Sequence, residues 1–281
     1  MSITKAYLKL SSLFFVLLVL GSCHRNTTKP EATKDKRTTV ELVTEMGTMV
    51  IELYNETPKH RDNFIKLTQE GAYDSVLFHR VINQFMIQSG DPDSKNAKID
   101  DALGNGDKPY KVAAEFHPDF FHKKGALGAA RDGNPERASS AMQFYIAQGK
   151  VKNDSLIDKD QKRINKWLAS HYSNLRPENK ALLDSLQKAN TDDTYEEYSR
   201  INDKLEKLAE NFTDFEKYII PEPHRAVYRT LGGTPHLDQN YTVFGEVIKG
   251  LEVIDSIAVV ETGFQDRPKK DVRIFSVRII E

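Results

Sequence analysis

Arg80 and Gln88 are the residues of this sequence whose types and setting best suit chemistry. They stand in residues 78–82 and 85–91, two short strand-like runs that are otherwise mainly apolar. Because side chains alternate between the faces of a strand, these polar side chains and the adjacent Phe85 and Met86 cannot all face the core. A guanidinium beside Phe and Met gives an apolar floor with one strong, forked hydrogen-bond donor. The alternative is structural, with Arg80 buried and paired to a carboxylate such as Asp91.

Composition excludes several other kinds of protein. The chain has 281 residues, of which 39% are hydrophobic and 29% charged, and its net charge is −1. These values indicate a globular protein and exclude disorder, collagen and a polytopic membrane protein. Because positive and negative charges balance, the chain has no excess of basic residues to bind nucleic acid, and none is expected as a partner. A single cysteine, Cys23, excludes an intramolecular disulfide and a cysteine-based zinc cluster.

Residues 1–22 have the pattern of a secretory signal peptide. Two lysines precede the apolar run of residues 13–20, which ends at small residues and is too short to span a membrane. The sequence Leu20-Gly21-Ser22-Cys23 resembles the bacterial lipobox, in which cleavage leaves the cysteine at the new amino terminus, carrying acyl chains. We expect Cys23 to be the lipidation site; a plain signal peptide followed by an incidental cysteine is the alternative.

The residues after the cysteine predict a tether and a location. Residues 23–37 contain almost no apolar side chains and should form a flexible linker. The acidic run that resembles a surface-export signal in some lipoprotein families is absent after Cys23. We therefore expect a lipid-anchored protein of the cell envelope that faces the periplasm, with the outer membrane favoured.

The elements that must position Arg80 and Gln88 are mainly strands, within one domain at residues 38–281. Two strands joined by a Gly-containing turn open it, and a helix runs from Thr57-Pro58 to Gly71. A second helix is expected at Leu251 to Ala258. Short apolar runs between turn residues favour an antiparallel barrel or sandwich. These runs lie at residues 76–78, 85–87, 125–128, 142–146, 241–245 and 272–280.

A helical insertion is expected to interrupt this domain at about residues 151–230. Charged residues alternate there with apolar residues at helical spacing, and no glycine occurs before Gly232. One helix face carries Trp167 and its neighbours. Another helix should follow the sequence Thr194-Tyr195-Glu196-Glu197, a capping box. The residues from Thr213 predict a last short helix that ends at Pro221.

Four ordered motifs resemble those of the cyclophilins, the peptidyl-prolyl cis-trans isomerases. The similarity covers about residues 38–150 and 232–281. It implies a mixed, mainly β fold: a closed antiparallel barrel of about eight strands, flanked by two helices and here carrying an α-helical insertion. The motifs are residues 78–91, 129–131, 143–146 and 236–245.

The resemblance implies a reaction that needs no nucleophile, metal or cofactor. Rotation about a prolyl peptide bond has a barrier of about 18–20 kcal/mol, because the nitrogen lone pair is delocalised into the carbonyl group. In the twisted state the lone pair localises on the prolyl nitrogen and accepts a hydrogen bond. Arg80 is the matching donor, and Gln88 is placed to orient Arg80 or the substrate backbone. The partners would be Xaa-Pro segments of unfolded or exported proteins.

The resemblance also assigns substrate-binding residues. Phe85, Met86, Tyr145 and Leu237 correspond to the apolar cup for the proline ring. Hydrogen bonds to the residues before the proline are assigned to Ala130, Arg131 and Gln143. Arg131 stands where another polar residue is common in the family, so either its backbone or its side chain could form the bond. Because isomerisation moves no proton, His79 and His236 are interpreted as groove wall. His236 replaces a tryptophan of the family members that bind cyclosporin tightly, so drug affinity should be weak, and Tyr241 replaces a common histidine.

Two alternatives remain open from the sequence. The insertion lies beside the prolyl pocket, where its helices could extend the groove or dock a protein partner, or could form a self-packed decoration without a role in substrate choice. The protein as a whole could be an isomerase that assists folding in the envelope, or a non-catalytic chaperone or binding module for Pro-containing segments. Retention of Arg80, Gln88 and Gln143 favours the isomerase.

Overall fold

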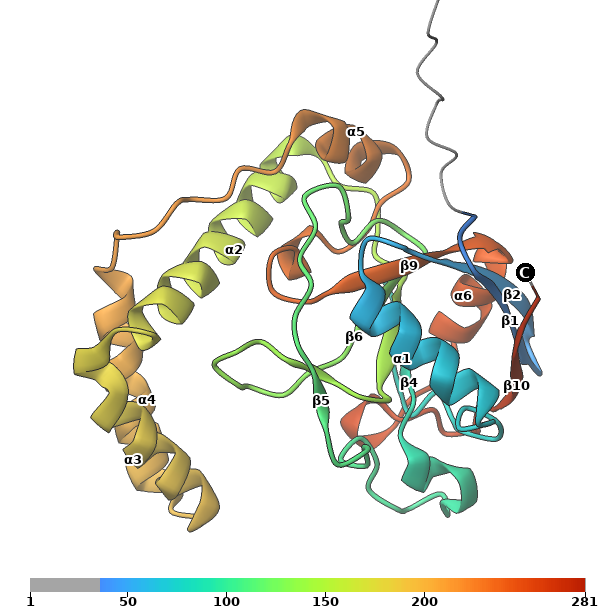
Figure 1. Ribbon diagram of the computed structural model, residues 1–281, viewed down its shortest axis with the longest axis horizontal. Coiled ribbons are helices and arrows are strands. Elements are labelled where there is room, and N and C mark those ends of the chain that lie inside the picture. The colour runs from blue at the N-terminus through green and yellow to red at the C-terminus, as the bar shows by residue number, and fades with distance from the viewer. Residues whose placement is uncertain (1–35, 281) are drawn as a thin grey trace, which may run out of the picture. The chain divides into compact units, whose positions relative to one another are not determined.

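Ten strands and six α-helices form within residues 36–280, the part of the chain that the computed structural model describes (Figure 1). The predicted signal peptide, Cys23 and nearly all of the predicted tether lie outside these residues. The strands are β1 (Thr39–Thr44), β2 (Gly47–Leu53), β3 (Arg80–Ile82), β4 (Met86–Ser89), β5 (Lys111–Val112), β6 (Ala126–Ala129), β7 (Ser139–Ser140), β8 (Phe144–Ala147), β9 (Val243–Lys249) and β10 (Ile274–Ile279). The α-helices are α1 (Pro58–Gln69), α2 (Asp154–Asn174), α3 (Lys180–Thr191), α4 (Tyr195–Glu210), α5 (Glu222–Thr230) and α6 (Leu251–Ala258). Short 3₁₀ helices are η1 (Pro92–Asn96), η2 (Pro177–Asn179), η3 (Pro235–Leu237) and η4 (Phe264–Asp266).

Eight strands form one curled antiparallel sheet in the order β10-β1-β2-β9-β6-β8-β4-β3. Backbone hydrogen bonds join its two ends. The amide of Phe78 donates to the carbonyl oxygen of Val272 at 2.8 Å, and the amide of Ile274 donates to that of Val76 at 2.9 Å. The mainly-β fold predicted from the sequence, with an antiparallel barrel of about eight strands, is therefore confirmed. The remaining strands, β5 and β7, pair with each other.

The barrel interior is filled by alternate side chains of neighbouring strands. Val81, Ile87, Leu127 and Ile146 come from β3, β4, β6 and β8, and each is buried. The apolar faces of α1 and α6 pack against the same core. Because successive strand residues point to opposite faces, the residues between these core positions must face outward. The two flanking helices are confirmed, and α6 has the predicted bounds.

The first turn of α1 is capped by a distant carboxylate. Thr57 is the N-cap residue, as predicted, but its side chain makes no cap hydrogen bond and donates instead to the carbonyl oxygen of Tyr54. Glu115 accepts hydrogen bonds from the amides of Lys59 and His60 at 3.1 and 3.0 Å. A carboxylate suits this position because the helix N-terminus carries unpaired amides and a partial positive charge.

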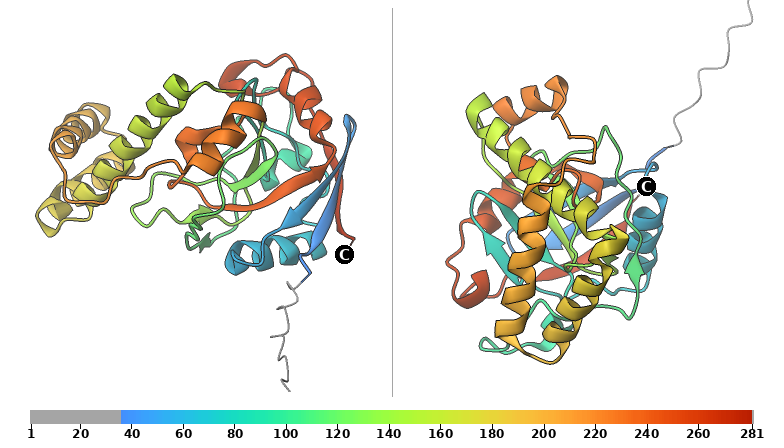
Figure 2. Two further views of the ribbon diagram at one scale, coloured as in Figure 1. Left: turned by 90° about the horizontal axis from the view of Figure 1, so that it is seen from above. Right: turned by 90° about the vertical axis from the view of Figure 1, so that its left-hand side faces the viewer.

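Helices α2 to α5 occupy residues 151–230, which we call the helical segment (Figure 2). Ile157, Ile164 and Leu168 of α2 form a buried cluster with Ile220 and Tyr228. Helix α4 packs against both α2 and α3, as expected for its apolar stripe. None of the helices among residues 36–280 combines the length and the apolar character needed to cross a membrane.

Two details predicted for the helical segment are wrong. Thr194 is the N-cap of α4, but its hydroxyl donates to the carbonyl oxygen of Ala189, and no capping box forms. The short helix predicted to end at Pro221 is absent, and α5 instead begins after this proline.

Side chains of α2 explain the missing helix. Asn165 bonds both backbone groups of Tyr218, and the side-chain carbonyl of Gln161 accepts a hydrogen bond from the amide of Ile220. The backbone of this stretch is therefore satisfied by α2 and not by a helix of its own.

We predict that α3 and α4 can be removed without unfolding the barrel. The Arg176 guanidinium lies 5.8 Å from the Phe212 ring, so a short Gly-Ser linker can replace residues 177–211. This deletion removes no member of the barrel core or of the buried cluster on α2. Thermal unfolding monitored by circular dichroism should remain cooperative.

The contrasting variant lacks residues 151–229 and with them Tyr228, whose hydroxyl donates to the buried Asp238 at 2.7 Å. Leaving that carboxylate oxygen without its donor should cost about 1–3 kcal/mol of unfolding free energy. Equal stability of the two deletion variants would contradict the prediction.

Candidate functional site

Strand register brings Arg80, Gln88 and Tyr145 side by side on the outer face of the barrel. Arg80 of β3 pairs with Gln88 of β4, Gln88 pairs with Tyr145 of β8, and Tyr145 pairs with Gly128 of β6. Directly opposed residues of antiparallel strands have Cβ atoms about 5 Å apart and share one face. The two polar residues singled out from the sequence are therefore cross-strand neighbours.

Gly128 makes room for the aromatic ring in this row. A Cβ atom at Gly128 would lie 2.3 Å from Cζ of Tyr145, closer than any packed side chain allows. The ring of Tyr145 can lie across β6 only because this position has no side chain.

A small pocket of about 150 Å³ opens beside the row. Phe85 forms one wall, where its ring stacks on His236 at a centroid distance of 5.4 Å. Tyr145 and Tyr241 meet edge to face at 5.9 Å. The structure brings together nine of the twelve residues predicted for catalysis and substrate binding; the lining residues are Arg80, Phe85, Met86, Gln88, Ala130, Arg131, Tyr145, Leu237 and Tyr241.

Arg80 lies at the edge of the small pocket with its side chain about half exposed. Its Nε donates to Oδ2 of Asp266 at 3.4 Å, and Nη1 donates to Oε1 of Gln88 at 3.5 Å. These two long contacts set the direction of the guanidinium and leave other N–H groups free. The structural alternative for Arg80 holds in part, because Arg80 pairs with a carboxylate, but the side chain is not buried and the carboxylate is that of Asp266. The buried Asp91 instead accepts hydrogen bonds from the amides of Asp93 and Gly104.

Gln143 and Ala130, which were predicted to hydrogen-bond the residues before the proline, already form hydrogen bonds within the protein. Gln143 is buried, donates to the carbonyl oxygens of Gly104 and Gly106, and accepts from Gln88 at 3.0 Å. It supports Gln88 and is not among the residues that line the pocket. The amide of Ala130 donates to the Gln143 carbonyl oxygen.

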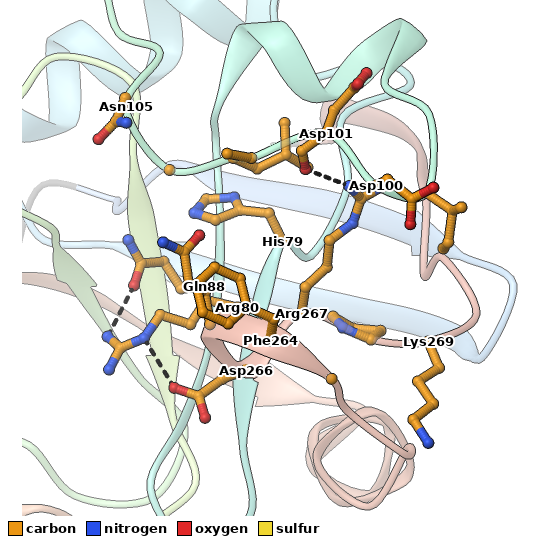
Figure 3. Close-up of a pocket in the computed structure, with 17 residues that line it drawn as sticks. His79, Arg80, Gln88, Asp100, Asp101, Asn105, Phe264, Asp266, Arg267 and Lys269 are labelled. Carbon is orange, nitrogen blue, oxygen red and sulfur yellow. Dashed lines mark hydrogen bonds and ion pairs between the residues drawn. The ribbon is translucent and has the colours of Figure 1, made fainter.

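A larger cavity, of about 840 Å³, lies on the other side of Arg80 (Figure 3). Its walls are His79 and two loops, residues 99–105 and 263–269. The sequence did not indicate these loops, because they carry no periodic pattern and Asp266 is 186 residues from Arg80. Gln265 and Asp266 have positive φ values of 56° and 59°, a backbone conformation uncommon for residues other than glycine.

The floor of the small pocket rests on a buried chain of hydrogen bonds. The hydroxyl of Tyr145 is 2.8 Å from Nε2 of His122, and Nδ1 of His122 is 2.7 Å from Oδ1 of Asp238. The other oxygen of Asp238 accepts from the hydroxyl of Tyr228 in α5. Because a carboxylate oxygen only accepts, the hydrogen bond to Asp238 is donated by Nδ1 of His122. The helical segment thus contributes directly to the pocket floor.

Both histidines of the groove wall are neutral at pH 7. Burial lowers the pKa of His79 to about 4. Burial, with the nearby Arg163, Lys152 and His122, lowers the pKa of His236 to about 3. His236 lies between Phe85 and Trp167 of α2, whose ring centroid is 6.4 Å away. Trp167 was predicted only as part of an apolar helix stripe.

Within residues 36–280 no three His, Cys, Asp or Glu side chains cluster to hold a metal ion.

Comparison with known proteins gives consistent results. The sequence model of one family, described as "Cyclophilin type peptidyl-prolyl cis-trans isomerase/CLD", matches residues 39–207 and 227–279. A protein of Staphylococcus saprophyticus named "Putative peptidyl-prolyl cis-trans isomerase" is 30% identical over 239 residues, which cover 85% of this chain and 89% of that protein.

Two further matches differ in extent. A "Putative bifunctional phosphatase/peptidyl-prolyl cis-trans isomerase" of Streptococcus pyogenes serotype M6 is 28% identical over 96% of this chain, which spans 45% of that longer protein. The crystal structure of a cyclophilin type peptidyl-prolyl cis-trans isomerase from Cryptosporidium parvum has a TM-score of 0.51 at 17% identity, covering 88% of this chain and 99% of that one. The last match bears on the fold alone.

We predict that acidification destabilises the protein through its buried histidines. An unfolded histidine has a pKa near 6.5, whereas folded His236 has a pKa of about 3. Between these values the unfolded state binds more protons, so stability falls as the pH falls. Going from pH 7 to 4.5, His236→Phe should lose about 2 kcal/mol less unfolding free energy than the wild type. Urea unfolding at the two pH values measures the difference.

The control for this prediction is a comparison at pH 8, where the histidine is neutral in both states. The ring of a phenylalanine should preserve the stacking on Phe85. Parallel pH curves for the variant and the wild type would refute the assignment.

Proposed function

The chain belongs to the cyclophilin-type peptidyl-prolyl cis-trans isomerases, and we propose that it catalyses isomerisation of Xaa-Pro bonds in unfolded or exported proteins of the cell envelope. The observation that carries the proposal is the Arg80 guanidinium at the edge of a small pocket whose walls include Phe85, Met86 and Leu237. The pocket has a volume of about 150 Å³, much smaller than the neighbouring cavity of about 840 Å³, so it suits a compact side chain such as that of proline.

Catalysis would come from selective stabilisation of the twisted amide. The planar amide has its nitrogen lone pair delocalised, so the nitrogen is a poor acceptor in either ground state. At the twisted state the same nitrogen becomes a good acceptor, and an N–H of Arg80 donates to it. An interaction that is stronger in the transition state than in the ground state accelerates the reaction.

The surroundings of Arg80 fit this task. Its contacts with Gln88 and Asp266 are both at least 3.4 Å long, so neither holds a strong hydrogen bond that the substrate would have to replace. A bound peptide would cover the half-exposed guanidinium, and removal of water strengthens its electrostatic interaction with the substrate. Gln88 is itself held by Gln143, which limits the orientations open to Arg80.

Neither wall histidine is needed as an acid or a base. Isomerisation about the amide bond moves no proton, and both His79 and His236 stay neutral because burial depresses each pKa. Their part in the proposal is to shape the apolar surface around the proline.

Arg80→Ala should lower kcat/KM for a short Xaa-Pro peptide by about 100-fold, as for loss of one donor to a developing charge. Because the half-exposed side chain carries little of the packing, circular dichroism should be unchanged. Arg200→Ala, which removes an exposed arginine of α4, is the matched control and should keep wild-type activity. Full activity in a folded Arg80→Ala variant would refute the assigned role. Inactivity of the folded wild type would favour a non-catalytic binding module.

The proposed envelope location is supported by the signal-like residues 1–22 and the lipobox-like Leu20-Gly21-Ser22-Cys23. Acyl chains on Cys23 would anchor the protein to a membrane, since each buried methylene contributes about 0.8 kcal/mol. The outer membrane is favoured, with the domain facing the periplasm. The domain would then work on segments exposed during export.

Metabolic labelling with palmitate tests the anchor. Cys23→Ala should abolish the label, because the sole cysteine of the chain is removed. Ser11→Ala, a change within the same signal-like segment, should keep it. Label that persists in Cys23→Ala would rule out lipidation at that residue.

A further inference from the structure

A groove of about 440 Å³ lies beside the prolyl pocket, between the 131–137 loop and helices α2 and α3. We call it the side groove. Arg131 and Tyr241 line both the side groove and the pocket, so the two cavities are neighbours across these side chains. On the helical side its walls include Trp167, His171, Leu183 and Leu186.

Two guanidinium groups with no carboxylate partner among the described residues line the side groove. Arg131 donates from Nε to the carbonyl oxygen of Asn240 at 2.9 Å and lies 4.9 Å from the Tyr241 ring. Arg137 donates from Nη1 to the carbonyl oxygen of Gln239 at 2.7 Å and lies 4.5 Å from the Phe116 ring. Within residues 36–280 no carboxylate hydrogen-bonds either guanidinium; the Asp132 carboxylate attracts Arg131, and this attraction contributes to the lowered pKa of Asp132, whereas the hydrogen-bond partners of both arginines are neutral.

The electrostatics of neighbouring groups agree with this excess of positive charge. Burial lowers the pKa of His171 to about 4, helped by Arg137 and Arg131. Burial, together with the Arg131 charge, also lowers the pKa of Arg137. Asp132 is the one carboxylate among the lining residues, and it pairs with Lys111 at 3.0 Å.

A third guanidinium packs against Trp167, one of the residues that line the side groove. Arg163 of α2 lies 4.8 Å from the Trp167 ring and also makes no ion pair within the described part of the chain. The side groove therefore combines unpaired positive charge with the apolar surface of Trp167, Leu183 and Leu186. A site of this kind suits a side chain with an aliphatic stem and an anionic end.

We propose that the side groove is a specificity subsite that binds an acidic side chain, Asp or Glu, of the same polypeptide segment whose proline occupies the pocket. The proposal rests on the proposed function and adds a preference to it. Because the cavities share two side chains and an extended chain advances about 3.3–3.6 Å per residue, the acidic residue lies within a few residues of the proline. The helical segment then selects substrates.

The test uses short peptides with one Xaa-Pro bond that carry Glu, Gln or Lys at each position up to about four residues on either side of the proline. Both kcat/KM and the dissociation constant are measured for every peptide with the wild-type protein. At the position that reaches the side groove, Glu should be preferred over Gln by about fivefold or more, and Lys should be the poorest. High salt should reduce the preference.

Arg137→Gln should lower the Glu-to-Gln ratio by at least half, because it removes one of the two guanidinium groups that line the groove; the neutral peptide serves as the internal reference for each variant. Arg200→Gln removes the same charge from the exposed face of α4 and should retain the ratio. A ratio of one at every position in the wild type, a preference for Lys, or a Glu preference that Arg137→Gln leaves undiminished would overturn the subsite. If no peptide is isomerised, the proposed function fails, and the ratio of dissociation constants still decides the subsite.

Discussion

The cross-strand register of Arg80, Gln88 and Tyr145 is the constraint on which the rest of the site depends. Each side chain is placed by the pairing of its strand, and a shift of one residue would turn all three into the barrel interior. That shift is prevented by Val81, Ile87 and Ile146, whose burial on the opposite face stabilises the register. The apolar core and the polar site are therefore two faces of the same strands, and the stability of one guarantees the geometry of the other.

The helical segment is joined to this site at two points. Tyr228 of α5 completes the hydrogen bonds of Asp238, and through His122 it supports the hydroxyl of Tyr145 below the pocket. Trp167 of α2 lies beside His236, which stacks on Phe85. A decoration without influence on the pocket would have neither contact. Helices α3 and α4 lie farther out, so the parts of the segment differ in their importance for the barrel.

Much of the fold and of the pocket could be predicted from local patterns. Alternating apolar residues indicated the strands. The motif at residues 78–91 placed Arg80 and Gln88 on two consecutive strands, which the structure pairs with each other. The failures all concern hydrogen-bond partners. Thr57 and Thr194 carry the right side chain for a cap, yet Glu115 caps α1 from 55 residues away and Thr194 bonds the preceding turn. Likewise, Asn165 and Gln161 replaced a predicted helix before Pro221. For α1 and for the stretch before Pro221, a partner distant in sequence replaced the local hydrogen bond, whereas Thr194 bonds a carbonyl oxygen only five residues away.

The sequence by itself determined the fold class, the main strands and the two flanking helices, because hydrophobic period is a local property. The resemblance of its motifs to those of the cyclophilins indicated most of the residues that line the pocket. Only the tertiary structure decided that Asp266 contacts Arg80, that Asp91 bonds a loop, and that Arg131 and Arg137 line one groove in which no carboxylate of the described residues hydrogen-bonds to them. These pairings join segments that no local pattern relates. They arise when the closed barrel fixes which loops meet, so that burial and charge choose partners among groups already brought together in space.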